Sequence, residues 1–313
     1  MRPMLATKGT HVPDGEAWVH EVKWDGVRIL ADSVRDADGG DARLWSRNGN
    51  DVTPAWPEIS AGPLAGRDVL VDGEVIALND RGVPDFRVLQ DRIHTRKATT
   101  ALRLSARIPA TFMVFDLLRL DGTDLTDQTL ERRRHLLGEL LGGPEADGTW
   151  QVPDSYDDGQ MLFEATLQQG LEGIVSKRRT SRYVFDQRSP HWIKLAHRHR
   201  HSYVVGGWRP QEGTSDRLAA VLVGERTPDG LLYRGRVGSG IGGKAGRMLA
   251  DLLAPLARDA SPFADEVPRL DARGTHWVEP SVVVDVDTHG AGYQRLRQPS
   301  FQGVRTDVRV EDL

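Results

Sequence analysis

The sequence contains no cysteine among its 313 residues. This absence excludes disulfides, cysteine metal sites and thiol nucleophiles. No apolar run approaches the roughly 20 residues that a membrane span requires, and the N-terminus has no signal-peptide core. Together these absences predict a cytoplasmic protein with no membrane association.

Charge of either sign is not in large excess. The chain has 41 Lys and Arg against 45 Asp and Glu, a formal net charge of −4, so the total charge does not by itself indicate a nucleic-acid partner. Hydrophobic residues make up 39% and charged residues 27%, values that are typical of folded chains rather than disordered ones. The length is sufficient for two domains, each with its own core.

Lysine is scarce, since only six of the basic residues are Lys. A high-GC genome accounts for a general preference for arginine. Arginine stays charged in proteins, whereas a buried lysine amine can become neutral and nucleophilic. Each lysine is therefore a candidate functional residue: Lys8, Lys23, Lys97, Lys177, Lys194 and Lys244.

Two regions of different pattern follow one another. The first mixes strand-like and helical segments, with strands expected at 18–30, 44–46, 69–71, 75–78, 111–118 and 173–177 and helices at 86–92, 130–141 and 159–169. In the second, one helix at 245–257 interrupts short strands at 203–208, 218–224, 231–237 and 282–286. The second pattern fits a small β-barrel such as an OB-fold, although an SH3-like barrel would look much the same.

Residues 21–28, Glu-Val-Lys-Trp-Asp-Gly-Val-Arg, are the main candidate for chemistry. Lys23 stands at a strand end, just before the turn-forming Asp25-Gly26, and Arg28 follows five residues later. This arrangement can present a nucleophilic amine, with the arginine free to contact phosphate or ribose. A surface hairpin of mixed charge explains the octapeptide equally well when it is taken alone.

Four further blocks strengthen the first interpretation. Asp72-Gly73-Glu74 interrupts two apolar strands, where an unpaired carboxylate is costly, so it requires a ligand, a metal or a basic partner. The other three blocks are Phe115-Asp116, residues 172–177 and residues 192–195. Each alone is also typical of a core strand with solvated ends, but five such blocks in this order are hard to ascribe to chance.

The order of these motifs resembles the covalent nucleotidyltransferases, and specifically the ATP-dependent DNA ligases. The closest similarity is to the stand-alone bacterial ligase C group and the ligase module of ligase D. The signature is Lys-x-Asp-Gly-x-Arg at 23–28, and the resemblance extends over residues 46–49, 205–208, 235–240 and 295–301.

The resemblance implies an α+β fold. A nucleotidyltransferase (adenylation) domain with antiparallel sheets and flanking helices would occupy residues 1–200, and an OB-fold β-barrel would occupy residues 201–313. No further domain precedes Lys23 in this chain, which predicts a minimal two-domain ligase.

The resemblance also implies an activity, the sealing of 5′-phosphate/3′-hydroxyl nicks in duplex DNA with ATP as AMP donor and Mg²⁺ or Mn²⁺ as metal. Lys23 would form lysyl-AMP, AMP would pass to the 5′-phosphate, and the 3′-hydroxyl would then displace it. The expected partner of this monomeric protein is nicked duplex DNA, with a repair polymerase or primase, or Ku-like end-joining factors, as further partners.

Individual roles follow from the same resemblance. Catalysis is assigned to Lys23 and Lys194. The nucleotide would be held by Glu21 beside the adenine, Phe115 stacked on it, Arg28 and Glu74 on the ribose, and Lys177 and Lys194 near the α-phosphate. The metal would be held by Glu172 with Asp25 as helper, and DNA would be bound by Arg47 at the 5′-phosphate and by Arg182 and Arg188.

Two positions depart from the family pattern. Ala196 stands where the family has a second lysine, and the C-terminal Arg-x-Asp-Lys motif is represented by Arg305, Asp307 and then Val308. The family uses that motif to orient pyrophosphate, so both losses predict slow turnover. Alternatives are an RNA ligase or capping-type nucleotidyltransferase, or a catalytically weakened nucleic-acid-binding scaffold. The blocks at 206–208 and 236–240 favour the bacterial DNA-ligase group.

Overall fold

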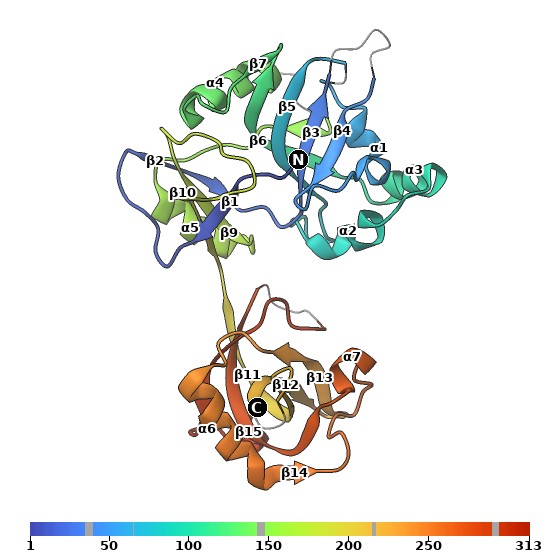
Figure 1. Cartoon of the computed structure of the whole chain (residues 1–313), viewed down its shortest axis with the longest axis vertical. Helices are drawn as coiled ribbons and strands as arrows, with labels where there is room; N and C mark the ends of the chain where they lie inside the picture. Colours follow the sequence, from blue (N-terminus) through green and yellow to red (C-terminus); the bar gives the residue numbers. More distant parts are fainter. Residues whose placement is uncertain (35–39, 65, 143–147, 215–216, 290–293) are drawn as a thin grey trace. The chain divides into compact units, whose positions relative to one another are not determined.

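The computed structural model describes residues 1–34, 40–64, 66–142, 148–214, 217–289 and 294–313. The chain divides into two compact units, Met1–Ala196 and His197–Leu313 (Figure 1). The boundary between them lies within the stretch 194–202, where the sequence pattern changes.

Two sheets frame the first unit. One has the strand order β1 (Leu5–Lys8), β10 (Arg188–Ala196), β9 (Gly173–Arg178) and β2 (Trp18–Val22), with β1 parallel to β10. The other has the order β4 (Arg43–Ser46), β3 (Val27–Ser33), β5 (Val69–Ile76), β6 (Thr111–Leu120) and β7 (Thr123–Asp124), and β8 (Trp150–Gln151) runs parallel to β6.

Two strand predictions require correction. The segment expected as one strand at 18–30 is split into β2 and β3 by a turn, and these two strands belong to different sheets. The segments expected as separate strands at 69–71 and 75–78 form the single strand β5, because the intervening polar residues pair across the sheet like the rest of the strand.

Helices flank these sheets: α1 (Pro57–Ser60), α2 (Phe86–Ile93), α3 (Ala98–Arg107), α4 (Leu130–Leu141) and α5 (Gly159–Gln168), with a 3-10 turn at Thr53–Ala55. The side chains of Asp85, Thr129 and Asp158 cap the N-termini of α2, α4 and α5 by accepting backbone N–H groups. The sequence did not indicate α3. Of the helices that the structure describes, none is both long and apolar enough to cross a membrane.

A large apolar core lies within the β3–β6 sheet and the helices next to it. Trp56, Phe112 and Trp150 are among its fully buried or nearly buried side chains, and the Trp150 indole donates to the Ile59 carbonyl at 2.9 Å. A smaller core that contains Leu30, Phe115 and Trp192 joins this sheet to the other one. This second core brings the ends of both sheets together around the candidate site.

The second unit is built on one antiparallel sheet. Its order is β13 (Gly230–Val237), β12 (Leu218–Thr227), β11 (His199–Pro210), β15 (His276–Thr288) and β14 (Ala257–Arg258), and β16 (Ser300–Arg305) also pairs with β15. The remaining elements are α6 (Gly243–Leu253), α7 (Arg269–Ala272) and 3-10 turns at Ala254–Leu256 and Val310–Asp312. Leu249 and Leu253 of α6 pack into the core of this sheet.

Candidate active site

A cavity of about 500 Å³ opens in the first unit. Its lining comes from both sheets and includes most of the residues to which the sequence assigned a role: Glu21, Lys23, Arg28, Arg47, Glu74, Phe115, Lys177, Arg188 and Lys194. Residues that are up to about 170 positions apart in the sequence therefore meet around one space.

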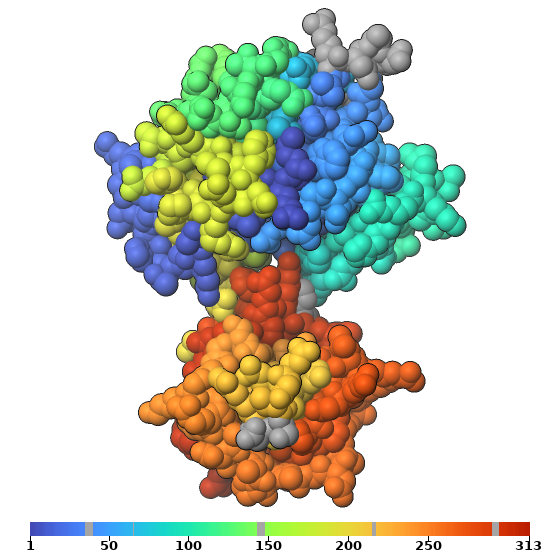
Figure 2. All heavy atoms as spheres, in the orientation of Figure 1, coloured from blue at the N-terminus to red at the C-terminus, as the bar shows by residue number. Residues whose placement is uncertain are grey.

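The N-terminal segment forms part of the wall. Leu5 and Ala6 line the cavity, and Arg2 reaches the Asn48 carbonyl at 3.3 Å and the Asp186 carboxylate at 3.5 Å. Figure 2 shows these first residues, in dark blue, between the yellow segment near residue 185 and the light-blue region near residue 50.

Lys23 lies in the turn directly after β2. Its Nζ is 2.5 Å from Glu172 Oε2, and both side chains are largely buried. The turn is tight because Gly26 passes next to β5, where a Cβ atom would lie 2.2 Å from the Val75 carbonyl oxygen. The predicted nucleophile and the predicted metal ligand are thus direct neighbours.

Arg28 is held by the carboxylate of Asp72, to which its Nε and one terminal nitrogen donate at 2.6 and 2.7 Å. Asp72 is fully buried and also accepts from the Tyr183 hydroxyl at 2.6 Å. Asp72, which interrupts apolar strands and was expected to need a ligand, a metal or a basic partner, is therefore paired with a basic residue, Arg28. The Arg28 guanidinium also lies 4.6 Å from the centre of the Phe115 ring.

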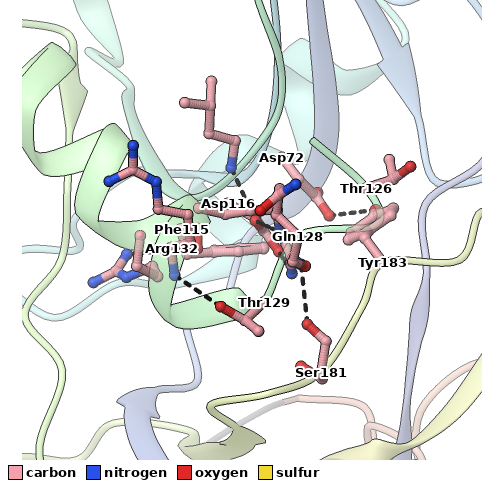
Figure 3. Close-up of polar contacts among 12 residues, drawn as sticks. Asp72, Phe115, Asp116, Thr126, Gln128, Thr129, Arg132, Ser181 and Tyr183 are labelled. Atoms are coloured by element: carbon pink, nitrogen blue, oxygen red, sulfur yellow. Dashed lines mark hydrogen bonds and ion pairs between the residues drawn. The ribbon is translucent and has the colours of Figure 1, made fainter. Parts of the chain in front are cut away.

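A second buried ion pair lies beside the first. Asp116 is the cross-strand partner of Asp72, and Arg133 of α4 donates to it at 2.7 and 2.9 Å. Figure 3 shows Asp116 together with Asp72 and Tyr183 in this polar cluster. Both Asp116 and Arg133 are fully buried, so the second residue of the Phe115-Asp116 block supports the fold behind the cavity.

Sequence reasoning missed Tyr183 and Arg133. Tyr183 follows Arg182, to which a DNA contact was assigned, and Arg133 is the middle one of three consecutive arginines in a predicted helix; neither residue was given a role. The one available signal was that Asp72 and Asp116 interrupt apolar strands and therefore need donors.

Lys177 lies close to Glu21 and to two aromatic rings. Its Nζ donates to Glu21 Oε2 at 2.7 Å and lies 4.3 Å from the ring centres of Phe115 and Trp192. The side chain is 2% exposed, and burial lowers the pKa of Lys177 below its usual range. Lys177 thus lies with the two residues expected at the adenine, whereas its own predicted place was near the α-phosphate.

Cations gather elsewhere in the cavity. Burial, and then the charges of Lys23, Arg47 and Arg188, lower the pKa of Lys194. Four basic side chains that line the same cavity favour the binding of a polyanion between them. Glu74 lies on the same lining, and burial raises the pKa of its carboxyl to about 7.

Five predicted residues are not among those that line this cavity within the described part of the chain: Glu172, which reaches it through its ion pair with Lys23, and Asp25, Arg182, Arg305 and Asp307. Arg182 is exposed and pairs with Asp127 at 3.4 Å. The carboxylate of Asp25 lies 3.4 Å from the backbone nitrogen of Phe86, at the start of α2. Arg305 and Asp307 belong to the second unit, where they pair with each other at 2.8 Å.

The part of the chain that the structure describes contains no group of three or more His, Asp or Glu side chains arranged to hold a metal by themselves. Glu172, the best candidate from the sequence, is already paired with Lys23. A metal at this place would therefore need oxygen ligands from a bound molecule as well.

Comparison with known proteins identifies the family. The model described as ATP dependent DNA ligase domain matches residues 3–195, and the model described as ATP dependent DNA ligase C terminal region matches residues 214–308. The chain belongs to the ATP-dependent DNA ligase family. The family prediction and the predicted fold, an adenylation domain followed by an OB-fold, are both confirmed.

Known relatives cover most or all of the chain. Multifunctional non-homologous end joining DNA repair protein LigD of Mycobacterium tuberculosis is 36% identical over 318 residues, which cover 100% of this chain and 39% of that protein. DNA ligase C of the same organism is 33% identical over 237 residues, 74% of this chain and 63% of that protein. This chain thus spans about two fifths of the length of its LigD relatives.

Two solved structures are similar over the full length. The ligase domain of M. tuberculosis LigD is 36% identical with a TM-score of 0.56, and it covers 100% of this chain and 97% of that one. The structure of a mycobacterial DNA ligase D complexed with ATP and MES is 35% identical with a TM-score of 0.57 and the same coverage.

Proposed function

We propose that this protein is an ATP-dependent DNA ligase that seals 5′-phosphate/3′-hydroxyl nicks in duplex DNA, with ATP as the AMP donor. The observation that carries the proposal is the position of Lys23. Its amine stands next to Glu172 in a cavity that has aromatic and carboxylate groups at one place and three further cations at another. The ATP-bound ligase D structure supports the choice of nucleotide.

In the first step, the Lys23 amine attacks the α-phosphate and pyrophosphate leaves. An amine must be neutral to attack, so its proton has to go elsewhere. The Glu172 carboxylate, 2.5 Å from Nζ, is placed to accept that proton or to hold it away from the phosphorus. AMP then passes to the 5′-phosphate of the nick, and the 3′-hydroxyl displaces it.

The charges of the lining suggest the orientation of the nucleotide. Phe115 and Glu21 would contact the adenine. Lys177 would lie with them, rather than near the α-phosphate, because its amine donates a hydrogen bond to Glu21. Arg28, fixed by Asp72, and Glu74 would contact the ribose. The phosphates would lie among Lys23, Lys194, Arg47 and Arg188, since positioning and charge neutralisation are the main needs of phosphoryl transfer.

A divalent cation fits this site with Glu172 as its protein ligand. Mg²⁺ is commonly held by one or two carboxylates together with phosphate oxygens and water, and Mn²⁺ suits the same oxygen ligands. When bound, the metal would neutralise charge on the reacting phosphate. Asp25 would assist only if its carboxylate turned away from the start of α2.

The remaining roles concern DNA and pyrophosphate. Arg47 and Arg188 would contact the nick from the cavity, and Arg182 would contact the duplex from the exposed segment next to it. Arg305 and Asp307 of the second unit would act on the pyrophosphate side during self-adenylylation. The names of the LigD relatives include end joining, which supports that pathway for this chain. Its partners would then be a repair polymerase or primase, or a Ku-like factor, and it would act as a monomer in the bacterial cytoplasm.

The test is retention of label from α-labelled ATP on a denaturing gel, followed by sealing of a 5′-phosphorylated nick. Wild-type protein should retain label from ATP and not from GTP, and it should seal the nick. Lys23→Ala should do neither, yet it should weakly seal a nick that is supplied already adenylylated, because Lys23 serves only the first two steps.

Lys97→Ala is the matched control, since Lys97 is an exposed lysine outside the cavity. It should behave as wild type. Label from GTP alone would indicate a capping-type enzyme, and label from neither nucleotide would indicate a scaffold. Sealing of an ordinary nick by Lys23→Ala would overturn the assignment of the nucleophile.

A further inference from the structure

Arg134 of α4 does not line the candidate cavity, but it reaches two residues that do. Its Nε lies 3.8 Å from Glu21 Oε1, and one terminal nitrogen lies 3.5 Å from the carbonyl oxygen of Phe115. Its other terminal nitrogen donates to the Pro153 carbonyl at 2.6 Å. The side chain is 14% exposed and is therefore held in one place.

The three consecutive arginines of α4 have different surroundings. Arg132 is exposed, and Arg133 is fully buried in the ion pair with Asp116. Arg134 lies between these extremes and bridges β2, β6 and the segment after β8. Its contacts therefore converge on the two residues to which the proposed function assigns the adenine.

The two oxygens of the Glu21 carboxylate differ in their hydrogen bonds. Oε2 accepts a hydrogen bond from Lys177, whereas Oε1 is buried and has no hydrogen-bond partner among the described residues. At 3.8 Å, Arg134 attracts Oε1 without donating a hydrogen bond to it. Oε1 thus has acceptor capacity that the described residues do not use, and two cations compensate a charge that would be costly to bury alone.

A carboxylate in its charged form only accepts hydrogen bonds. It therefore favours a base that presents an exocyclic amino group at this place, and it disfavours a base that presents a carbonyl oxygen there. Selectivity of this kind depends on the carboxylate being held in one orientation, because a rotated carboxylate could relieve the repulsion.

We propose that Arg134 is a positioning residue for base selection. It fixes the orientation of the Glu21 carboxylate and the backbone of Phe115, so that the site prefers a purine with an amino group at C6 over one with a carbonyl oxygen there. The inference rests on the proposed ATP-binding function. It assigns Arg134 no contact with the nucleotide and no part in phosphoryl transfer.

A purely structural role for Arg134 makes a different prediction. If Arg134 only anchored the segment around Pro153, its loss would lower stability and weaken the binding of all nucleotides alike. If it orients Glu21, its loss changes the ratio between two nucleotides that differ only at the base.

The experiment measures equilibrium binding of ATP and of inosine triphosphate, which has a carbonyl oxygen in place of the amino group. Binding is measured by calorimetry in the full chain that carries Lys23→Ala, so that no covalent adduct forms. Both nucleotides then lose the same contact, the one with the Lys23 amine. The variants compared are Arg134→Met, Arg134→Lys and, as the matched control, Arg132→Met, which removes the same charge from the exposed neighbour.

With Arg134 intact, ATP should bind more tightly than inosine triphosphate. Arg134→Met should reduce this preference about tenfold, Arg134→Lys should retain most of it because the charge remains, and Arg132→Met should leave it unchanged. If Arg134→Met does not fold, Arg134→Gln replaces it, since Gln retains a donor for the Pro153 carbonyl without the charge.

An unchanged ratio in a folded Arg134→Met or Arg134→Gln chain would overturn the inference, and so would the absence of any preference with Arg134 intact. Failure of the proposed function is a separate result, because it appears as the absence of a labelled adduct in a chain that has Lys23.

Discussion

At the scale of single residues, Arg28 of the cavity lining is oriented by a residue that does not itself line the cavity. Arg28 is oriented by Asp72, which is itself held by Tyr183. A free arginine would lose rotamer entropy on binding ribose or phosphate, but this one has already been ordered by folding. The loss of rotamer entropy of Arg28 therefore occurs on folding and not on ligand binding.

Glu74 makes stability depend on pH. Burial raises the pKa of Glu74 to about 7 in the folded chain, compared with 4.5 for the ordinary group. Between these values the folded state keeps a proton that the unfolded state has lost, so stability falls as pH rises through this window. Glu74→Gln removes this dependence. The unfolding free energy of wild type should fall relative to the variant by about 3 kcal/mol from pH 4.5 to 7.5.

Urea unfolding at several pH values measures this difference. Parallel curves for wild type and Glu74→Gln would show that Glu74 titrates normally in the folded chain. The pH dependence should be present without ATP, because burial of Glu74 by the protein itself is the main cause of its raised pKa.

At the scale of elements, β5 and β6 place two buried carboxylates side by side at Asp72 and Asp116. Apolar residues at these two positions would avoid the free-energy cost of burying charges in the centre of a sheet. The arginines come from neighbouring elements, Arg28 from the adjacent strand β3 and Arg133 from α4. One ion pair therefore links β3 to β5 within the sheet, and the other links α4 to β6.

Removal of one partner of the second pair should be severe. Arg133→Met leaves the Asp116 carboxylate buried without its cation and should cost about 3–5 kcal/mol of unfolding free energy. Combining it with Asp116→Leu should recover most of that loss, because a buried ion pair can often be replaced by apolar groups. Equal stability of the single and the double variant, measured by urea unfolding, would contradict this account.

The basic stretch that leads from β9 through β10 should make DNA binding sensitive to salt. Each phosphate contact releases counterions and steepens the fall of affinity with salt concentration. Arg182→Gln and Arg188→Gln together should lower the slope of log K against log salt by about 2 and weaken the binding of a nicked duplex. An unchanged slope in fluorescence anisotropy titrations would mean that neither Arg182 nor Arg188 contacts a DNA phosphate.

The single variants separate the two positions. Arg188 lines the cavity and donates to the Ala6 carbonyl, whereas Arg182 is exposed beside Asp127. Arg188→Gln should therefore slow sealing as well as weaken binding, and Arg182→Gln should affect binding alone.

At the scale of the whole molecule, the two departures from the family pattern lie in different units, Ala196 at the end of the first and Val308 near the end of the second. If each lost lysine served one step, restoring it should accelerate that step only. Contacts to transition-state charge are commonly worth about 3 kcal/mol, or about a hundredfold in rate.

Val308→Lys should accelerate self-adenylylation and leave sealing of a pre-adenylylated nick unchanged. Ala196→Lys should do the opposite and accelerate the steps at the nick. Single-turnover rates of the two reactions measure the separation. If Lys194, Arg198 and Arg309 already compensate, neither restoration will change a rate. Faster sealing with unchanged adenylylation in Val308→Lys would show that this motif does not act on the pyrophosphate.

The sequence by itself determined the family and the fold, and it pointed to most of the polar residues that line the cavity. Motifs such as Lys-x-Asp-Gly-x-Arg are local, because the turn at Asp25-Gly26 and the strand before it are set by short-range chemistry. The apolar strands around Asp72 also showed that a buried carboxylate must have a donor, whichever residue supplied it.

Only the tertiary structure decided which donors those are and which groups meet. Tyr183, Arg133 and Arg134 carry no local signal, because an arginine on a helix or a tyrosine in a basic segment is usually solvated. Their roles arise when α4 and the segment before β10 close over the β5–β6 sheet. The contacts of Lys177 were open for the same reason. Its position in the chain fixes its strand, but the partner of a long, flexible side chain is decided by packing, here with Glu21 and two aromatic rings.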